Sequence, residues 1–266
     1  MHLRQILHEV PLWLLTLIVV AIAEIYSIGL LLLARRYYGV ERLATNNEVA
    51  GFKFAVVGLF YGVMLAFVVI AVWEDLHRTQ NAVRAEAKAA LDLQRLTLAM
   101  PADDGAEIRK LLTAYVQDVK TDEWPAMALG KSSDKVSEDL LGLSLAIFKM
   151  EAGERKELAL YQHALRLLTV ITDSRNERLD ASEGAVPKFL WFVLIAGGAI
   201  TLGYPAFFGA SHLQAQILMT ASLAALVSLS LALALAFDYP FTGGEHVSVV
   251  PFDQALQQMS GPEPAQ

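Results

Sequence analysis

Four long apolar runs constrain this chain more than any other feature of its sequence. Each is about as long as the roughly 20 residues that a helix needs to cross a hydrocarbon core. A backbone in lipid must satisfy its own hydrogen bonds, and a helix does so within one segment. The sequence therefore predicts an all-α protein that spans the lipid bilayer four times. The runs are Pro11 to Ala34, Phe52 to Trp73, Phe189 to Ala210 and Ile217 to Phe237.

Composition agrees with this class and excludes several others. Of the 266 residues, 55% are hydrophobic and only 18% are charged, a balance that few soluble domains of this size have. The chain has no cysteine, which excludes disulfides, thiolate chemistry and cysteine metal sites. A formal net charge of −7 argues against nucleic acid as a partner, because phosphate binding needs a basic surface.

The first run also has features of a signal peptide. Arg4 precedes the apolar stretch, and the small residues at 21–23 resemble a cleavage site. However, the run resumes at Ile25 and stops only at Arg35, which gives the length of a full span. We therefore expect an uncleaved anchor.

The third run is the least regular of the four. Residues that kink or end helices interrupt it, so we expect this span to kink or end near Tyr204. The short segment 211–216 that follows allows only a helical hairpin between the third and fourth spans. The interrupting residues are Gly197, Gly198, Gly203 and Pro205.

Most charged residues lie between the second and third runs. This divides the chain into two spans (1–73), a water-facing helical domain (74–188), two further spans (189–237) and a tail (238–266). The end of the tail, Ser260 to Gln266, has the composition of a disordered segment. No proline or glycine occurs from Trp73 to Met100. The second span is therefore expected to continue into water as one helix of nearly fifty residues, about 70 Å long.

Three shorter helices are predicted after the long one, which ends at Pro101. Asp103 or Asp104 is expected to cap the first of them, and Trp124-Pro125 to close it.

Ser133 or Asp134 opens the next helix, and the last runs from about Glu154 to Asp180. Each helix has an apolar face at helical spacing, which we interpret as the core of a small bundle. The faces are Ile108, Leu111, Leu112, Tyr115, Val116 and Val119, then Val136, Leu140, Leu141 and Phe148, then Leu158, Tyr161, Leu165, Leu168, Thr172 and Leu179.

Basic residues do not settle the orientation. The loop between the first two spans holds Arg35, Arg36 and Arg42, with Lys53 at its edge, and the other side of the membrane has more basic residues spread over longer segments. Short loops carry more weight in this comparison. Our expectation places the helical domain and both termini in the cytoplasm.

Motifs of catalysis are missing from the sequence. It has no phosphate-binding loop, dinucleotide fingerprint, zinc helix or nucleophile elbow. The histidines never occur at the i, i+4 spacing of a helical metal site. The adjacent acids Asp103-Asp104 and Asp122-Glu123 are expected at helix ends, where acids cap or meet the helix dipole. We therefore expect no enzyme, no cofactor and no metal site.

Glu24 is a candidate functional residue because it lies near the middle of the first span. An ionised carboxylate there is expensive, and such residues are usually paired, neutral or functional. The alternatives are a protonated acid or one that is hydrogen-bonded to a neighbouring helix. Direct pairing with Lys53 is not expected, because Glu24 lies about 15 Å from the end of its helix.

The start of the second span carries two further candidates. Phe52, Val56 and Phe60 follow one another at four-residue spacing, so they share one face of a helix. This stripe either faces lipid or packs, or it lines a pore in which rings of apolar side chains gate by dewetting. Close approach of neighbouring helices is possible at Gly51, Gly58 and Gly62. Asn46, Asn47 and Glu48 either cap this helix or line a pore mouth.

Three segments resemble the bestrophin-like domain family of bacterial membrane proteins. They are NNEVAGFKFAVVGLFYGVMLAFVVIAVWE at 46–74, EWPAM at 123–127 and DYPF at 238–241, and the resemblance extends over about 10–252. A more distant similarity to the bestrophin anion channels concentrates in FAVVGLFYGV at 54–63, followed by the acidic exit at Trp73-Glu74.

This resemblance implies a multi-pass protein of the bacterial inner membrane that forms a homo-oligomer, a pentamer in bestrophins, and conducts an inorganic anion such as chloride. It places an apolar neck on Phe52, Val56 and Phe60. The chain departs from the bestrophin pattern at Val56, where the neck favours an aromatic residue. It also lacks an acidic cluster like the bestrophin calcium clasp, so calcium gating is not expected.

Two functional hypotheses follow from the sequence. In the first, the chain is a subunit of a bestrophin-like ion channel whose second span lines the pore. In the second, it is a non-conducting membrane-anchored sensor or scaffold whose helical domain binds a partner.

Overall fold

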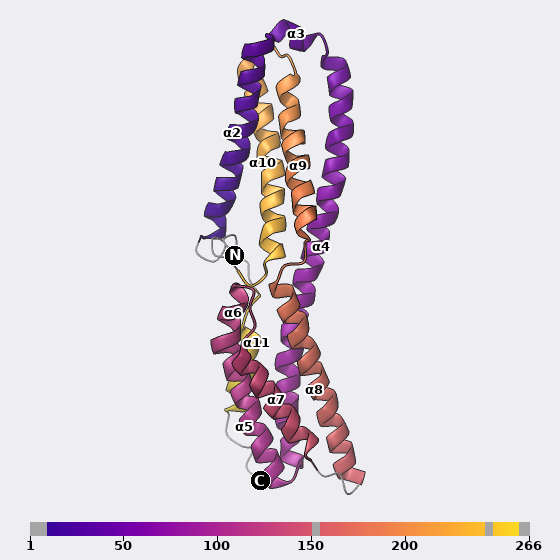
Figure 1. The fold of residues 1–266 in the computed structure, drawn as a ribbon, viewed down its shortest axis with the longest axis vertical. Helices are drawn as coiled ribbons and strands as arrows, with labels where there is room; N and C mark the ends of the chain where they lie inside the picture. Colours follow the sequence, from indigo (N-terminus) through magenta and orange to yellow (C-terminus); the bar gives the residue numbers. More distant parts are fainter. Residues whose placement is uncertain (1–9, 151–154, 243–246, 261–266) are drawn as a thin grey trace.

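Four long helices lie side by side in one half of the molecule, the upper half in Figure 1. In length and apolar composition, all four are suited to crossing a membrane. The structure is a computed structural model that describes residues 10–150, 155–242 and 247–260. The predicted four-span all-α class is confirmed. The four helices are α2 (Leu12–Tyr38), α4 (Asn47–Leu96), α9 (Lys188–Gly203) and α10 (Leu213–Asp238).

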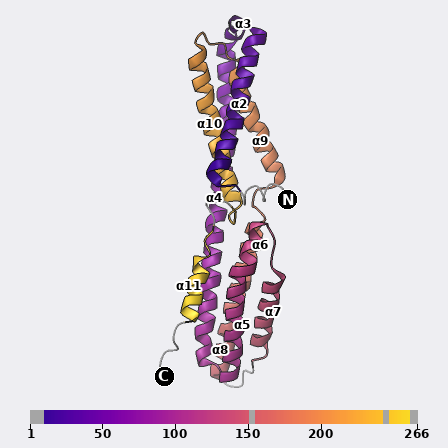
Figure 2. The same cartoon turned by 90° about the vertical axis from the view of Figure 1, so that its left-hand side faces the viewer.

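Shorter helices pack around the lower part of α4 and form the helical domain (Figure 1). The α8 helix runs beside α4 over much of this half, and Figure 2 shows α11 against α4. The elements of this half are η1 (Thr97–Ala99), α5 (Ala102–Asp118), the π-helical turn η2 (Val119–Glu123), α6 (Trp124–Ala128), α7 (Asp134–Phe148), α8 (Arg155–Ser182) and α11 (Val250–Met259). The short α3 (Val40–Ala44) and η3 (Tyr204–Phe207) lie at the opposite end of the molecule.

The α4 helix continues without a break from the spanning half into the helical domain, as predicted. It has 50 residues, which corresponds to about 75 Å at 1.5 Å per residue. The predicted boundary between residues 73 and 74 therefore lies inside a single helix. Both halves of the molecule are built on the same rod.

The predicted ends of the domain helices are only partly correct. Ser133 does cap α7, since its hydroxyl accepts a hydrogen bond from the amide of Val136. Asp103 and Asp104 do not cap α5. Pro101 occupies the N-cap position, and the two acids lie in the first turn, where the helix dipole favours negative charge.

Trp124-Pro125 was expected to end a helix, and this prediction is wrong. The chain stays helical through η2 and enters α6. Pro125 lies in the first turn of α6, directly after the π-helical turn η2.

The third span ends as predicted. The α9 helix stops at Gly203, and Tyr204–Phe207 forms a 3-10 turn.

The tail holds a helix that was not predicted from the sequence, α11, which packs on α4 and α5. Of the predicted disordered end, Ser260 to Gln266, Ser260 is the C-cap of α11, and residues 261–266 lie outside the described residues. The expected helix start at Glu154 lies outside them as well.

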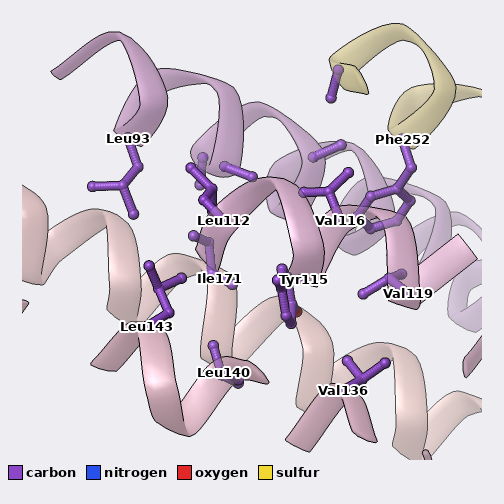
Figure 3. Close-up of a cluster of buried hydrophobic side chains, with 14 of the residues drawn as sticks. Leu93, Leu112, Tyr115, Val116, Val119, Val136, Leu140, Leu143, Ile171 and Phe252 are labelled. Carbon is purple, nitrogen blue, oxygen red and sulfur yellow. The ribbon is translucent and has the colours of Figure 1, made fainter. Parts of the chain in front are cut away.

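The largest buried core lies in the helical domain, where side chains from α4, α5, α7, α8 and α11 meet (Figure 3). The predicted face of α5 forms its centre, and Ile108, Leu112 and Tyr115 are fully buried. The predicted face of α7 is only partly correct. Val136 and Leu140 are buried, whereas Leu141 and Phe148 are exposed.

Candidate pore-lining helix and its supports

The three predicted neck residues lie on one exposed stripe of α4. Phe52 and Phe60 are 76% and 74% exposed, and Val56 is 41% exposed. The same face continues with exposed Val63 and Phe67. No element of the described chain covers these side chains, so a single copy leaves a long apolar face open.

The opposite face of α4 is packed against the other spans. Tyr61 is buried, and its hydroxyl donates a hydrogen bond to the carbonyl of Leu194 on α9 at 3.2 Å. A Cβ atom at Gly197 or Gly198 would lie 2.9 Å from the Tyr61 side chain. These two glycines therefore allow α9 to approach α4 closely, and the ring fixes which face of α4 points away from the bundle.

Two glycines of α4, Gly58 and Gly62, do not make the close contact with a neighbouring helix that the sequence suggested. A Cβ atom at Gly58 or Gly62 would meet nothing within 4 Å. Both glycines instead line an apolar groove of about 640 Å³ between α4 and α10. Within one chain, the glycines that allow another helix to approach α4 closely are Gly197 and Gly198 of the third span, α9.

The end of α4 near α3 is attached to the loop that follows η3. The Asn47 side chain donates a hydrogen bond from Nδ2 to the Gly209 carbonyl at 2.7 Å, and its Oδ1 accepts one from the Gly209 amide at 2.9 Å. Asn47 thus does not cap its helix. It forms a clasp, by which we mean a pair of side-chain hydrogen bonds that join two distant segments of the chain. Asn46 holds the N-cap position without a side-chain capping bond, and Glu48 is exposed in the first turn.

Gly209 is buried against α3, and a Cβ atom there would overlap the backbone of Val40 and Ala44. A second clasp at this end joins α2 to α10. Arg35 donates to the Ala210 carbonyl at 2.8 Å and to Gln216 Oε1 at 2.6 Å. The sequence offered no local signal for either clasp, because both join residues more than 150 positions apart.

Replacing Asn47 by alanine should loosen this end of α4. The amide and the carbonyl of buried Gly209 would each lose the hydrogen bond with Asn47. Unsatisfied buried polar groups cost about 1–3 kcal/mol. We expect a lower thermal unfolding midpoint for the purified protein and faster hydrogen exchange in residues 204–212. Asn46→Ala is the matched control, since the Asn46 side chain makes no capping bond. Equal effects of the two substitutions would contradict the assignment.

In the helical domain, α4 is held by a buried network of charged side chains. Arg178 on α8 is fully buried, and it donates from Nε to Glu86 Oε2 at 2.8 Å and from Nη2 to Glu86 Oε1 at 2.9 Å. The same Nη2 reaches Glu123 Oε2 at 2.8 Å. Arg175 pairs with the other oxygen of Glu123, and Tyr115 donates to Glu86 at 2.6 Å.

The two glutamates and two arginines of this network balance in charge, which is the condition for keeping ions in a protein interior. Burial alone raises the pKa of the Glu123 carboxyl, but hydrogen bonds from Arg175 and the charges of both arginines hold that pKa below its usual value. Burial and the neighbouring Glu86 carboxylate raise the pKa of Tyr115 well above its ordinary range. Glu123 therefore contributes stability at neutral pH that is lost as the pH falls through its folded-state pKa.

Aromatic side chains cover one side of the network. The Arg178 guanidinium carbon lies 5.7 Å from the ring centroids of both Trp124 and Phe252, within the range of a cation–π interaction. Phe241 stacks edge-on against Trp124 at 5.4 Å. The α11 helix and the segment before it thus close the network from the side of the tail.

Asp238 ties the two halves together where α10 ends. Its carboxylate accepts hydrogen bonds from the amide of Val186 at 2.7 Å and from the Trp191 indole at 2.9 Å. Asp238 is the first residue of the DYPF segment. This contact fixes the end of the fourth span against the link between α8 and α9.

Glu24 is half-buried on α2, and its backbone carbonyl accepts a hydrogen bond from the Ser27 hydroxyl. Among the described residues it forms no ion pair within 4 Å. A functional role for Glu24 stays a prediction. Throughout the described residues, no group of three or more histidine or acidic side chains could hold a metal ion.

These features define a class: an all-α membrane-protein fold in which one helix runs through both a four-helix spanning bundle and a helical domain. Crystal structures of a bacterial bestrophin homologue from Klebsiella pneumoniae have the same fold. A variant with a single substitution aligns at a TM-score of 0.69 and 15% identity, covering 90% of this chain and 97% of its own. A second variant gives 0.70 and 15%, with coverages of 92% and 98%.

The form solved by zinc phasing gives a TM-score of 0.69 at 14% identity, with coverages of 90% and 96%. A model of the Bestrophin-like domain family matches residues 21–252. The chain belongs to this family. No curated protein matches it.

Proposed function

We propose that this chain is a subunit of an oligomeric, bestrophin-like ion channel that conducts anions, with α4 of each copy lining the path. The exposed stripe of Phe52, Val56 and Phe60 carries this proposal, because it leaves an apolar face of α4 uncovered. Narrow apolar rings can gate ion flow by dewetting. Membership of the Bestrophin-like domain family supports the same function.

One copy contributes a single α4 helix, which cannot enclose a path, so the proposal requires a homo-oligomer. The apolar groove between α4 and α10 supports this, because its glycines leave room for a helix of a second copy. By resemblance, the ring is a pentamer in a bacterial inner membrane, with the helical domain in the cytoplasm. Light scattering of the solubilised complex, corrected for detergent, measures the number of subunits. A monomer or dimer contradicts the proposal.

The substitution Phe60→Ala tests the pore directly. Removing one aromatic ring per copy widens the apolar constriction and lowers its dewetting barrier, so we expect a several-fold rise in anion conductance across planar bilayers. The matched control is Phe192→Ala, which removes another exposed phenylalanine, on α9. It should leave conductance unchanged. If wild-type protein in liposomes passes neither anions nor cations at any voltage, the channel proposal fails.

One observation favours the second function, a sensor or scaffold that binds a partner. The α7 helix exposes Leu141, Leu145 and Phe148 at helical spacing on the surface of the helical domain. Apolar stripes of this kind mark interaction sites. In this case Phe60→Ala should change neither ion flux nor partner capture, whereas Leu145→Asp should abolish capture.

A further inference from the structure

Two carboxyl groups meet where α5 packs against α7. Asp118 is the last residue of α5, and Asp139 lies in the middle of α7. Lys135, one turn before Asp139 on α7, donates a hydrogen bond to Asp118 Oδ1 at 2.8 Å, and residues four apart lie on the same face of a helix. The Asp139 carboxyl is therefore a neighbour of the Asp118 carboxyl. The Asp118 side chain is only 14% exposed, so water screens this contact poorly.

Asp139 carries a buried oxygen atom without a partner. Its Oδ2 is removed from solvent, and it is the one such side-chain nitrogen or oxygen in the described part of the chain that no hydrogen bond satisfies. An ionised carboxylate can only accept hydrogen bonds, whereas a protonated one can donate. A proton on this carboxyl turns it into a donor, and Asp118 is the acceptor beside it.

The surrounding charges leave room for that proton. Lys135 on α7 is bonded to Asp118 Oδ1 at 2.8 Å and to Asp122 Oδ2 on η2 at 3.3 Å. Glu138 on α7 adds another negative charge. On α8, Arg175 reaches Ser137 of α7, but Glu123 already engages it. Around Asp139, one ammonium group is therefore already bonded to two other carboxylates, and neighbouring negative charges favour protonation of one carboxyl of such a group.

We propose that Asp118 and Asp139 share one proton and form a proton-binding pair that holds α5 against α7 in acid and loosens this contact when the proton leaves. The pair lies outside the spanning helices and away from the stripe on α4. The proposal does not depend on ion conduction. It assigns to the helical domain a sensitivity to pH near neutrality.

The expected pH range follows from the environment of Asp139. Burial, then hydrogen bonding of the protonated carboxyl to Asp118 and the negative charge of Asp118, raise the pKa of the Asp139 carboxyl to about 6. An aspartate in an unfolded chain has a pKa of about 3.9, so the folded protein binds this proton more tightly. The stability from the shared proton is complete below the unfolded value and is lost as the pH rises through about 6.

Infrared difference spectroscopy on the full-length protein in nanodiscs tests the proton itself. We expect a carboxylic acid C=O band that is present at pH 5, disappears with a midpoint near 6 and is missing in Asp139→Asn. Glu107→Gln is the matched control, since it removes one exposed carboxylate from α5 and should leave the band in place. A spectrum without the band at pH 5, or a band that survives in Asp139→Asn, overturns the proposal.

Hydrogen exchange tests the consequence for the fold. After correction for the intrinsic pH dependence of exchange, residues 134–148 of the wild type should be better protected at pH 5 than at pH 7.5. Asp139→Asn keeps a neutral donor beside Asp118 at every pH, so its protection should stay high and nearly constant. Equal pH dependence in wild type and variant overturns the proposed loosening.

Discussion

Replacing Arg178 by methionine is expected to destabilise the folded protein by about 3–5 kcal/mol, the usual cost of removing one partner from a buried ion pair. Methionine has a similar length but cannot donate, so Glu86 and Glu123 would keep buried charges with fewer partners. For unfolding of the whole 266-residue chain, that loss corresponds to a fall of roughly 6–20 °C in the unfolding midpoint. Thermal unfolding followed by circular dichroism in detergent measures it.

The control for this substitution is Arg166→Met, at an exposed position of the same helix, which should change stability by no more than about 0.5 kcal/mol. A double-mutant cycle then identifies the partner. Adding Glu86→Gln to Arg178→Met should cost much less than Glu86→Gln does alone, because the charge that has lost its partner is removed. Additive effects would show that the two side chains do not act as a pair.

Phe252→Ala is expected to cost about 3–5 kcal/mol, as is typical for truncation of a fully buried phenylalanine. The substitution opens a cavity beside Trp124 and removes one of the two rings beside Arg178. Hydrogen exchange should increase throughout residues 250–259, and the unfolding midpoint should fall.

Val250→Ala is the matched control for α11, because the Val250 side chain is about half exposed. It should leave exchange in the helix close to that of the wild type. If Phe252→Ala changes exchange only at residue 252 itself, then α11 is held by its polar contacts, such as Lys120 with Asp253, and not by the aromatic side chain.

Hydropathy and helix breakers predicted the large elements correctly because both act locally. The four spans, the unbroken helix through Trp73 and the end of the third span at Gly203 follow from the residues within each segment. The caps were less predictable. Asp103 and Asp104 had the right chemistry for a cap, but Pro101 already occupied that position.

The buried charge network could not be predicted, because its partners are far apart in the chain. Glu86 and Arg178 are separated by 92 positions, and an acid in a helix looks the same in sequence whether it is paired or exposed to water. Glu123 was expected at a helix end, yet it is fully buried. One signal was present: Glu86 falls at helical spacing within an apolar face of α4 that includes Val83 and Ala90.

For the predicted neck residues, the sequence shows which helix face they share but not what that face contacts. The spacing of Phe52, Val56 and Phe60 correctly placed them on one face, but the choice between lipid and a pore depends on neighbouring copies of the chain.

The continuity of α4 has a mechanical consequence. A helix of 50 residues without a proline acts as a lever. If it pivots near Tyr61, where α9 packs against it, the long arm lies in the helical domain and the short arm carries Phe52 and Val56, while Phe60 lies at the pivot. Over a length of about 75 Å, a rotation of roughly 5° moves one tip by about 6 Å relative to the other. A small displacement of the helical domain would thereby become a smaller, opposite movement of Phe52 at the other end of α4.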